Sequence, residues 1–196
     1  MTLDEMCMAA ARYSDRYDEF EKNDEGQYED DAAHYFKVFR DAINEAYMTV
    51  SREYAMPDTR AEVDVGEEGI IDLLSVEPVV CTVHDVLNAD GSANLPYNFR
   101  TKYEIEVIGA SEGDTVTLVY HYLPDKLEKL RDEPIFTEGI VDPMVYISLA
   151  VARMWKSEKK FDYANQWMQE YYSQLRNIKS SMLNRNKRRI PRRRFR

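Results

Sequence analysis

The hydrophobic pattern of the sequence changes its period twice, and these changes constrain the fold more than any other feature. Up to about residue 58, apolar side chains recur every three or four residues, which is the period of an amphipathic helix. Residues 59–123 instead contain β-branched runs separated by short turn signals, and helical spacing returns after them. The sequence therefore predicts an α+β fold, in which a small antiparallel β-sheet or sandwich is inserted into a bundle of about four helices.

Two helices are predicted before the insert. Thr2 and Glu5 have the spacing of a capping box at the start of a helix over about 3–20. Gly26 and its polar neighbours interrupt the pattern, and a second apolar stripe predicts one long helix over about 28–55, which Pro57 ends.

Five runs in the insert have the composition of strands. They are AEVDV (61–65), GIIDLLSV (69–76), PVVCTVHDV (78–86), YEIEVIG (103–109) and TVTLVYHYL (115–123). In the last run, alternation predicts one face that lies in the core and a second that faces something else. The first face holds Val116, Leu118, Tyr120 and Tyr122, and the second holds Thr117, Val119 and His121.

Two antiparallel helices are predicted after the insert. A connector with a single helical turn at 126–130 leads to Asp142, which is expected to cap a helix whose first residue is Pro143. A polar corner at 156–160 separates this helix from another over 161 to about 181. The expected core of the bundle is Phe36, Phe39, Ile43, Trp155, Trp167 and Tyr171. Both tryptophans are expected to pack onto the stripe formed by the first three residues.

These patterns divide the chain into four segments. Residues 1–58 are the N-terminal helices of the bundle, 59–123 the β insert, 124–184 the connector and C-terminal helices, and 185–196 a basic tail that is expected to be extended. Twelve extended residues could reach roughly 40 Å at about 3.3 Å per residue.

The charge of the tail is opposite to that of the rest of the chain. Its sequence, RNKRRIPRRRFR, has eight basic residues and no acidic one, whereas the preceding 184 residues hold 18 basic against 36 acidic residues. Such a block repels itself and cannot bury apolar surface, so alone it is expected to be disordered. Either an acidic or phosphate-bearing partner orders it, which makes it a docking element, or it folds back on the acidic body of the same chain; we follow the first interpretation. Its apolar residues favour a shaped protein pocket over a nucleic-acid arm or an inert tail. The predicted docking residues are Arg185, Lys187, Arg188, Arg189, Ile190, Pro191, Arg192, Arg193, Arg194, Phe195 and Arg196.

An acidic run over 15–31 is the second charged feature. It lacks the alternation and the final bidentate Glu of an EF-hand, so it indicates a solvated acidic face and not a metal loop. In a ring of many copies, this face would line a surface or channel with a negative field. Its residues are Asp15, Asp18, Glu19, Glu21, Asp24, Glu25, Glu29, Asp30 and Asp31.

No catalytic, cofactor or metal site is predicted. His34, His84 and His121 are assigned to unrelated elements, and no nucleophile elbow, Walker A or dinucleotide-binding pattern occurs. Cys7 and Cys81 lie far apart, which predicts neither a disulfide nor a zinc site and suggests a reducing cytosol. The sequence shows no signal peptide or membrane span, so a soluble intracellular product is expected.

One aromatic stripe has two interpretations. Tyr163, Trp167, Tyr171 and Tyr172 could stack on nucleic-acid bases, but their helical spacing favours a hydrophobic core.

Four segments carry a resemblance to a known family. They are TVTLVYHYLPDKLEKLRDEPIF (115–136), VDPMVYISLAVARMW (141–155), FDYANQWMQEYYSQLRNI (161–178) and RIPRRRFR (189–196). In this combination the chain resembles the head-to-tail adaptors, also called connector or neck-ring proteins, of tailed bacteriophages. The resemblance covers about 115–196 and leaves the role of the β insert open.

The resemblance implies a structural protein of the virion neck, assembled in the host cytoplasm and without catalysis. In such adaptors the helical core forms a ring, usually twelvefold, below the portal, and the C-terminal segment clasps portal subunits. The implied partners are the portal protein, neighbouring copies, tail or nozzle proteins, and DNA in passage. Two alternatives remain: a nucleic-acid-binding accessory protein that uses the Arg-rich tail, and a tail-completion or stopper protein of the same assembly.

Overall fold

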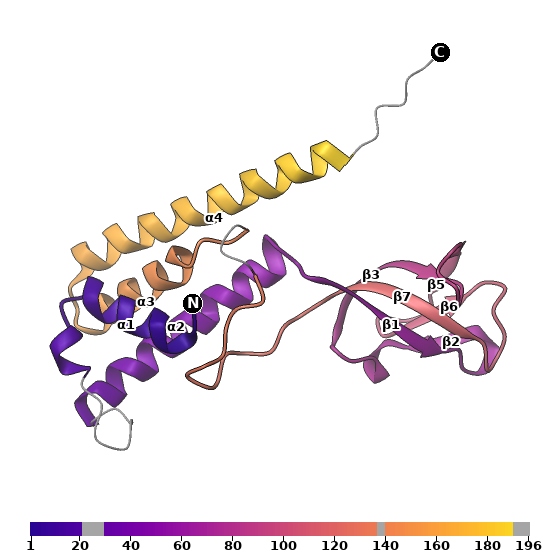
Figure 1. The fold of residues 1–196 in the computed structure, drawn as a ribbon, viewed down its shortest axis with the longest axis horizontal. Helices are drawn as coiled ribbons and strands as arrows, with labels where there is room; N and C mark the ends of the chain where they lie inside the picture. The colour runs from indigo at the N-terminus through magenta and orange to yellow at the C-terminus, as the bar shows by residue number, and fades with distance from the viewer. Residues whose placement is uncertain (21–29, 137–139, 190–196) are drawn as a thin grey trace, which may run out of the picture. The chain divides into compact units, whose positions relative to one another are not determined.

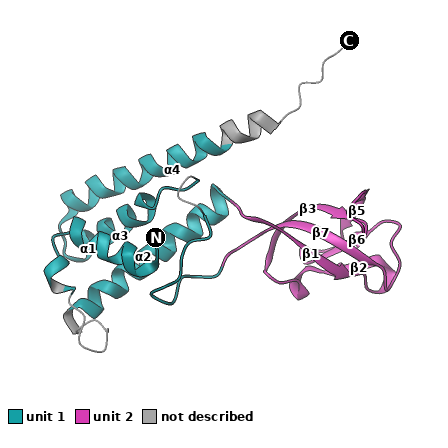
Figure 2. Ribbon diagram, in the orientation of Figure 1, with its two compact units in different colours: residues 1–55, 125–196 teal, residues 56–124 magenta. Residues whose placement is uncertain are grey.

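The chain folds into two units, each with its own hydrophobic core (Figure 2). The computed structural model describes residues 1–20, 30–136 and 140–189, and for 19, 30, 31 and 183–189 only the backbone. Unit 1 comprises Met1–Ala55 and Asp125–Arg196, and unit 2 comprises Met56–Pro124. The fold is α+β, as expected.

Unit 1 is a helical bundle built around one central helix. Its α-helices are α1 (Leu3–Tyr13), α2 (Asp30–Glu53), α3 (Met144–Ser157) and α4 (Phe161–Arg189), with a short 3-10 helix η1 at Tyr17–Glu19 (Figure 1). Helix α3 packs against α1, α2 and α4, and most of its residues are buried because it is apolar on nearly every side. No helix in the described part of the chain is long and apolar enough to cross a membrane.

Helix α1 starts as predicted but ends earlier. The capping box at its start is confirmed: the Glu5 N–H donates to Thr2 Oγ1 (3.2 Å), and the Thr2 N–H donates to Glu5 Oε2 (2.9 Å). The helix stops at Tyr13 and not near residue 20. The Ser14 hydroxyl donates to the Ala10 carbonyl at 2.7 Å, and Asp15 adopts a left-handed conformation with φ 53°, so the chain turns away.

The connector is held by hydrogen bonds and does not contain the predicted helical turn at 126–130. The Asp132 carboxylate accepts from the N–H groups of Glu128 and Lys129 at 2.8 Å each. In turn, the Leu3 N–H donates to the Asp132 carbonyl at 2.8 Å. The connector thus fixes a turn of its own and also satisfies a free amide at the start of α1.

Helices α3 and α4 confirm the predicted hairpin. Helix α3 begins at Met144, one residue later than predicted, with Pro143 at the N-cap position. The Asp142 carboxylate still accepts from the Met144 N–H at 2.9 Å, so it satisfies an amide at the start of the helix. Helix α4 begins at Phe161 but continues to Arg189, beyond the predicted end near 181. The expectation of an extended tail is therefore wrong for residues 185–189, whose backbone is helical. Residues 190–196 lie outside the described part of the chain.

Unit 2 contains two small antiparallel sheets. One has the order β1 (Asp58–Asp64), β7 (Thr115–Tyr122), β3 (Val80–Leu87) and β4 (Asn94–Leu95). The other has the order β2 (Ile70–Asp72), β6 (Glu104–Val107) and β5 (Tyr97–Phe99). Side chains of both sheets share one core. Two short 3-10 helices, η2 (Glu67–Gly69) and η3 (Leu73–Ser75), complete the unit.

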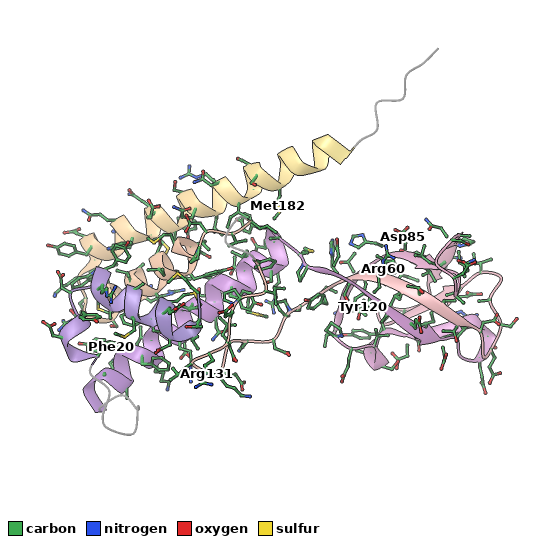
Figure 3. All side chains as sticks on the ribbon, in the orientation of Figure 1. Phe20, Arg60, Asp85, Tyr120, Arg131 and Met182 are labelled. Atoms are coloured by element: carbon green, nitrogen blue, oxygen red, sulfur yellow. The ribbon has the colours of Figure 1, made fainter. Side chains whose placement is uncertain are left out.

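Strand β7 confirms the predicted alternation. Val116, Leu118 and Tyr120 are buried, and His121 lies on the opposite, partly exposed face. Inside the unit, the Tyr120 hydroxyl donates to the Glu77 carbonyl at 3.1 Å (Figure 3). The central strand of the larger sheet therefore has one face committed to the core and one free to carry other chemistry.

Candidate functional site

The predicted docking tail lies mostly outside the described residues. Ile190, Pro191, Arg192, Arg193, Arg194, Phe195 and Arg196 belong to the undescribed segment, and Arg185, Lys187, Arg188 and Arg189 are described by backbone alone. Because the backbone of 185–189 is helical, these five residues span about 1.5 Å each in place of about 3.3 Å, which shortens the expected reach of the tail by roughly 9 Å. Its docking contacts stay a prediction.

The base of this tail is anchored in the bundle. Ile178 of α4 is buried in the core of unit 1, and Met182 packs partly against the same core (Figure 3). Arg185 follows only three residues later. The basic segment therefore extends from a helix whose preceding turns are fixed by apolar contacts.

The predicted acidic face is described at two of its nine residues. Asp15 and Asp18 are exposed, whereas Glu21, Asp24, Glu25 and Glu29 lie outside the described residues, and the side chains of Glu19, Asp30 and Asp31 are not described. Tyr17, which lies between these two residues in the sequence, has the Arg12 guanidinium 4.7 Å from the centre of its ring. The acidic face stays a prediction for the other seven residues.

Unit 2 has a large excess of acidic over basic residues. Residues 56–124 contain thirteen Asp and Glu residues but only three Arg and Lys residues. Strand β1 illustrates the pattern, because its exposed positions are Asp58, Arg60, Glu62 and Asp64. The sequence interpretation missed this surface because its acidic residues alternate with apolar ones instead of forming a run.

The predicted core residues of the bundle are buried to different degrees. Phe39, Ile43, Trp155 and Tyr171 are buried, whereas Phe36 and Trp167 are partly buried at the edge of the core. The Trp155 ring lies 5.2 Å from the Tyr163 ring, and the Trp167 ring lies 5.3 Å from the Tyr13 ring.

The aromatic stripe of α4 is therefore only partly core. Burial raises the pKa of Tyr171 to about 12, in agreement with its place in the interior. Tyr163 and Tyr172 are exposed, so the core interpretation is wrong for these two residues. Exposed aromatic residues alone do not identify a ligand.

One ion-pair network joins the helices at the α3–α4 corner. The Glu158 carboxylate accepts hydrogen bonds from Arg16 and from the Tyr35 hydroxyl, the latter at 3.2 Å. It also forms an ion pair with the Lys160 ammonium at 3.1 Å. Partial burial acts to raise the pKa of Glu158, but the hydrogen bond from Lys160 and the Arg16 charge outweigh it, so the pKa is lowered. This network holds the α3–α4 corner against Arg16 and against Tyr35 of α2.

A polar groove of about 880 Å³ lies between α2 and the connector. Arg40, Glu45 and Arg52 of α2 line one side, and Lys126 and Glu128 line the other. Charges of both signs line it, and Glu45 already pairs with Arg153 of α3. The groove has the character of a hydrated surface and not of an apolar ligand pocket.

The remaining cluster contains two histidines and one aspartate in unit 2. His121 of β7 lies opposite Asp58 of β1 in the antiparallel register, and its Nδ1 atom is in close contact with Asp58 Oδ1. His84 of β3 places its Nε2 atom 3.9 Å from Asp58 Oδ1, and its ring centre 3.9 Å from that of His121. The assignment of the histidines to unrelated elements is therefore wrong for His84 and His121, which occupy neighbouring strands. His34 lies in α2, in unit 1.

The comparison with known proteins adds no relative to this picture. No protein-family model matches the chain, and no curated protein matches it. A proposed function consequently depends on the residues described above and on the resemblance carried by the C-terminal segments.

Proposed function

We propose that the protein is a head-to-tail adaptor of a tailed bacteriophage. Several copies form a ring below the portal, and each is docked by its basic C-terminal tail in an acidic groove of a portal subunit. The ring is structural and catalyses no reaction. By resemblance to the family it has twelve copies, and its further contacts are made with tail or nozzle proteins.

The observation that supports this proposal is the place of the basic block on the chain. Eight positive charges follow directly after the turns of α4 that contact the core, and the 184 residues before them have a strongly negative net charge. The buried Ile178 fixes the direction in which the helix leaves the bundle. A rigid base with a short charged end suits attachment to one neighbouring protein, because less freedom is lost on docking than for a long free arm.

The acidic body suits the second requirement of such a ring, which is the passage of DNA. Carboxylates repel the phosphate backbone, whereas Lys and Arg would hold it. We infer that the acidic residues of unit 2, together with the acidic run over 15–31, are those that face the channel or its mouth. DNA would then slide past without binding.

The test measures binding of the full chain to the portal protein of the same phage at two salt concentrations. Replacing Arg192, Arg193, Arg194 and Arg196 by Gln should weaken binding most at low salt, because screening already reduces their attraction at high salt. Phe195→Ala should weaken binding at both concentrations, since apolar contact is not screened. A Phe195→Ala protein that binds portal like the wild type would contradict the pocket model.

The matched control removes four positive charges elsewhere. Lys129, Arg131, Lys156 and Lys179 are exposed, and their replacement by Gln should leave portal binding nearly unchanged. Duplex DNA serves as the rival partner: a nucleic-acid arm would bind it with a steep salt dependence, of about −0.9 in the logarithmic slope per phosphate contact, and with little effect of Phe195→Ala. Electron microscopy of the portal complex then shows whether the bound copies form a ring.

A further inference from the structure

We propose that unit 2 carries a binding site for a divalent transition metal, formed by Asp58, His84 and His121. The site is independent of the adaptor proposal. Its three residues come from the adjacent strands β1, β3 and β7, with β7 in the middle. Zn²⁺ is the ion that this set of ligands fits best.

The geometry brings one ligand atom of each residue into a single small volume. The three atoms lie within 4.8 Å of one another. Ligands of a tetrahedral zinc ion, at about 2.0–2.2 Å from the metal, lie roughly 3.3 Å apart. Only a rotation of the side chains is therefore needed to close the site. The Asp58 side chain is free to rotate in this way, because it is 62% exposed.

A β-bulge accounts for the position of His84. The pairing of β3 with β7 shifts between Val83 and Asp85, so His84 is an extra residue opposite no single partner. Bulges turn a side chain out of strict alternation, and they often occur beside functional sites. Here the bulge brings the imidazole of His84 against that of His121, with the two rings nearly perpendicular at 88°.

The buried nitrogen of His121 gives the second reason for a metal. Its Nδ1 atom is buried and makes no hydrogen bond to any residue that the structure describes, although it is in close contact with the Asp58 carboxylate. A buried polar atom without a hydrogen bond carries a free-energy cost. Coordination of a metal between the imidazole and the carboxylate would satisfy both groups.

The chemistry of the ligands selects the metal. Two imidazoles and one carboxylate suit Zn²⁺ and similar ions, whereas Ca²⁺ and Mg²⁺ prefer oxygen ligands. The fourth position is open to water, since the side chains of His84 and Asp58 are exposed. The excess of acidic residues in unit 2 adds a general attraction for cations. We expect the bound ion to hold β1, β7 and β3 together.

The experiment titrates the untagged, chelator-treated full chain with Co²⁺, followed by visible absorption, and then displaces Co²⁺ with Zn²⁺. We expect one ion per chain. His84→Ala and His121→Asn should each weaken binding roughly tenfold to a hundredfold or more, since even partners of ligands have effects of about this size. Zn²⁺ should raise the melting temperature of the wild type but not of His84→Ala.

The third histidine provides the matched control. His34 is exposed on α2 in unit 1, so His34→Ala should bind Co²⁺ like the wild type. His84 is exposed at a bulge, so His84→Ala is expected to fold and tests the site by itself if His121→Asn does not fold. A wild type that binds no Co²⁺ or Zn²⁺ would overturn the proposal, and so would unchanged binding by His84→Ala. Neither result bears on docking to the portal.

Discussion

The side chain of Asn44 pairs with the backbone of Leu127 across two parts of the chain that are 83 residues apart. Its amide nitrogen donates to the Leu127 carbonyl at 2.9 Å, and its amide oxygen accepts from the Leu127 N–H at 2.8 Å. Both residues are buried. One side chain thereby attaches the connector to α2 and supplies both partners that a buried peptide group requires.

Replacing Asn44 by Ala should therefore destabilise the protein by about 2–4 kcal/mol, because a buried donor and a buried acceptor both lose their partner. Urea unfolding followed by circular dichroism measures this change. Asn177, which is exposed on α4, is the matched control, and Asn177→Ala should change the free energy of unfolding by less than about 0.5 kcal/mol. Equal effects of the two substitutions would mean that water replaces the Asn44 amide.

Two buried tyrosines should respond in opposite ways to loss of the hydroxyl. The Tyr47 hydroxyl accepts from the Ile135 N–H at 3.3 Å, whereas the Tyr146 hydroxyl is buried and has no hydrogen-bond partner in the described part of the chain. Burial also raises the pKa of Tyr146. Tyr47→Phe should cost about 1 kcal/mol, and Tyr146→Phe should be neutral or stabilise by up to about 1 kcal/mol. Thermal melts of the two variants test the difference, and a clear loss of stability in Tyr146→Phe would reveal a partner for its hydroxyl.

The lowered pKa of Glu158 makes part of the stability dependent on pH. The folded state favours the charged carboxylate, so this stability is present above the ordinary Glu pKa of about 4.3 and is lost as the pH falls through the lower folded pKa. Glu158→Gln should cost about 1–2 kcal/mol at pH 7 and almost nothing at the acid end of the range. The exposed pair of Glu45 and Arg153 is the control, since Glu45→Gln should have a small effect at every pH. If Glu158→Gln still lowers the free energy of unfolding at low pH, the effect would come from altered packing and not from the carboxylate charge.

The sequence predicts elements best where one period continues for many residues. The stripe of α2 and the alternation of β7 are long enough to be seen, and both are confirmed. Strands β4 and β5 have two and three residues, too few to show a period, and lie in a segment rich in Asn, Gly and Pro. The run GIIDLLSV contains only a short strand, because the Asp72 carboxylate accepts from the Leu74 N–H and turns the chain into η3.

The candidate sites show the same limit more strongly. His84 and His121 are 37 residues apart in the sequence, and their contact depends on which strands pair and on a bulge. Neither property has a signature in composition or spacing. The sequence did predict that His121 lies on the face of β7 opposite the core, and this prediction is confirmed. Charge, in contrast, is visible without a fold, so the basic tail could be recognised from the sequence alone.

Two truncations test whether the basic segment acts apart from the body of the protein. A chain that ends at residue 184 keeps Ile178 and Met182, the last residues of α4 described in contact with the core. We expect its free energy of unfolding to fall by less than about 1 kcal/mol, the size of a favourable interaction between basic residues and a helix C-terminus. A chain that ends at residue 177 loses both contacts and should be destabilised by about 2–5 kcal/mol.

Urea unfolding of both chains at low and high salt separates two roles for the tail. If the basic segment serves a partner, only the shorter chain is destabilised, and salt changes little. If the segment instead folds back on the acidic body, the chain ending at 184 should be less stable than the full chain at low salt. At high salt the two chains should have the same free energy of unfolding, because exposed ion pairs are screened. The second result would contradict the tail as a free docking element, since its arginines would already be paired within the same chain.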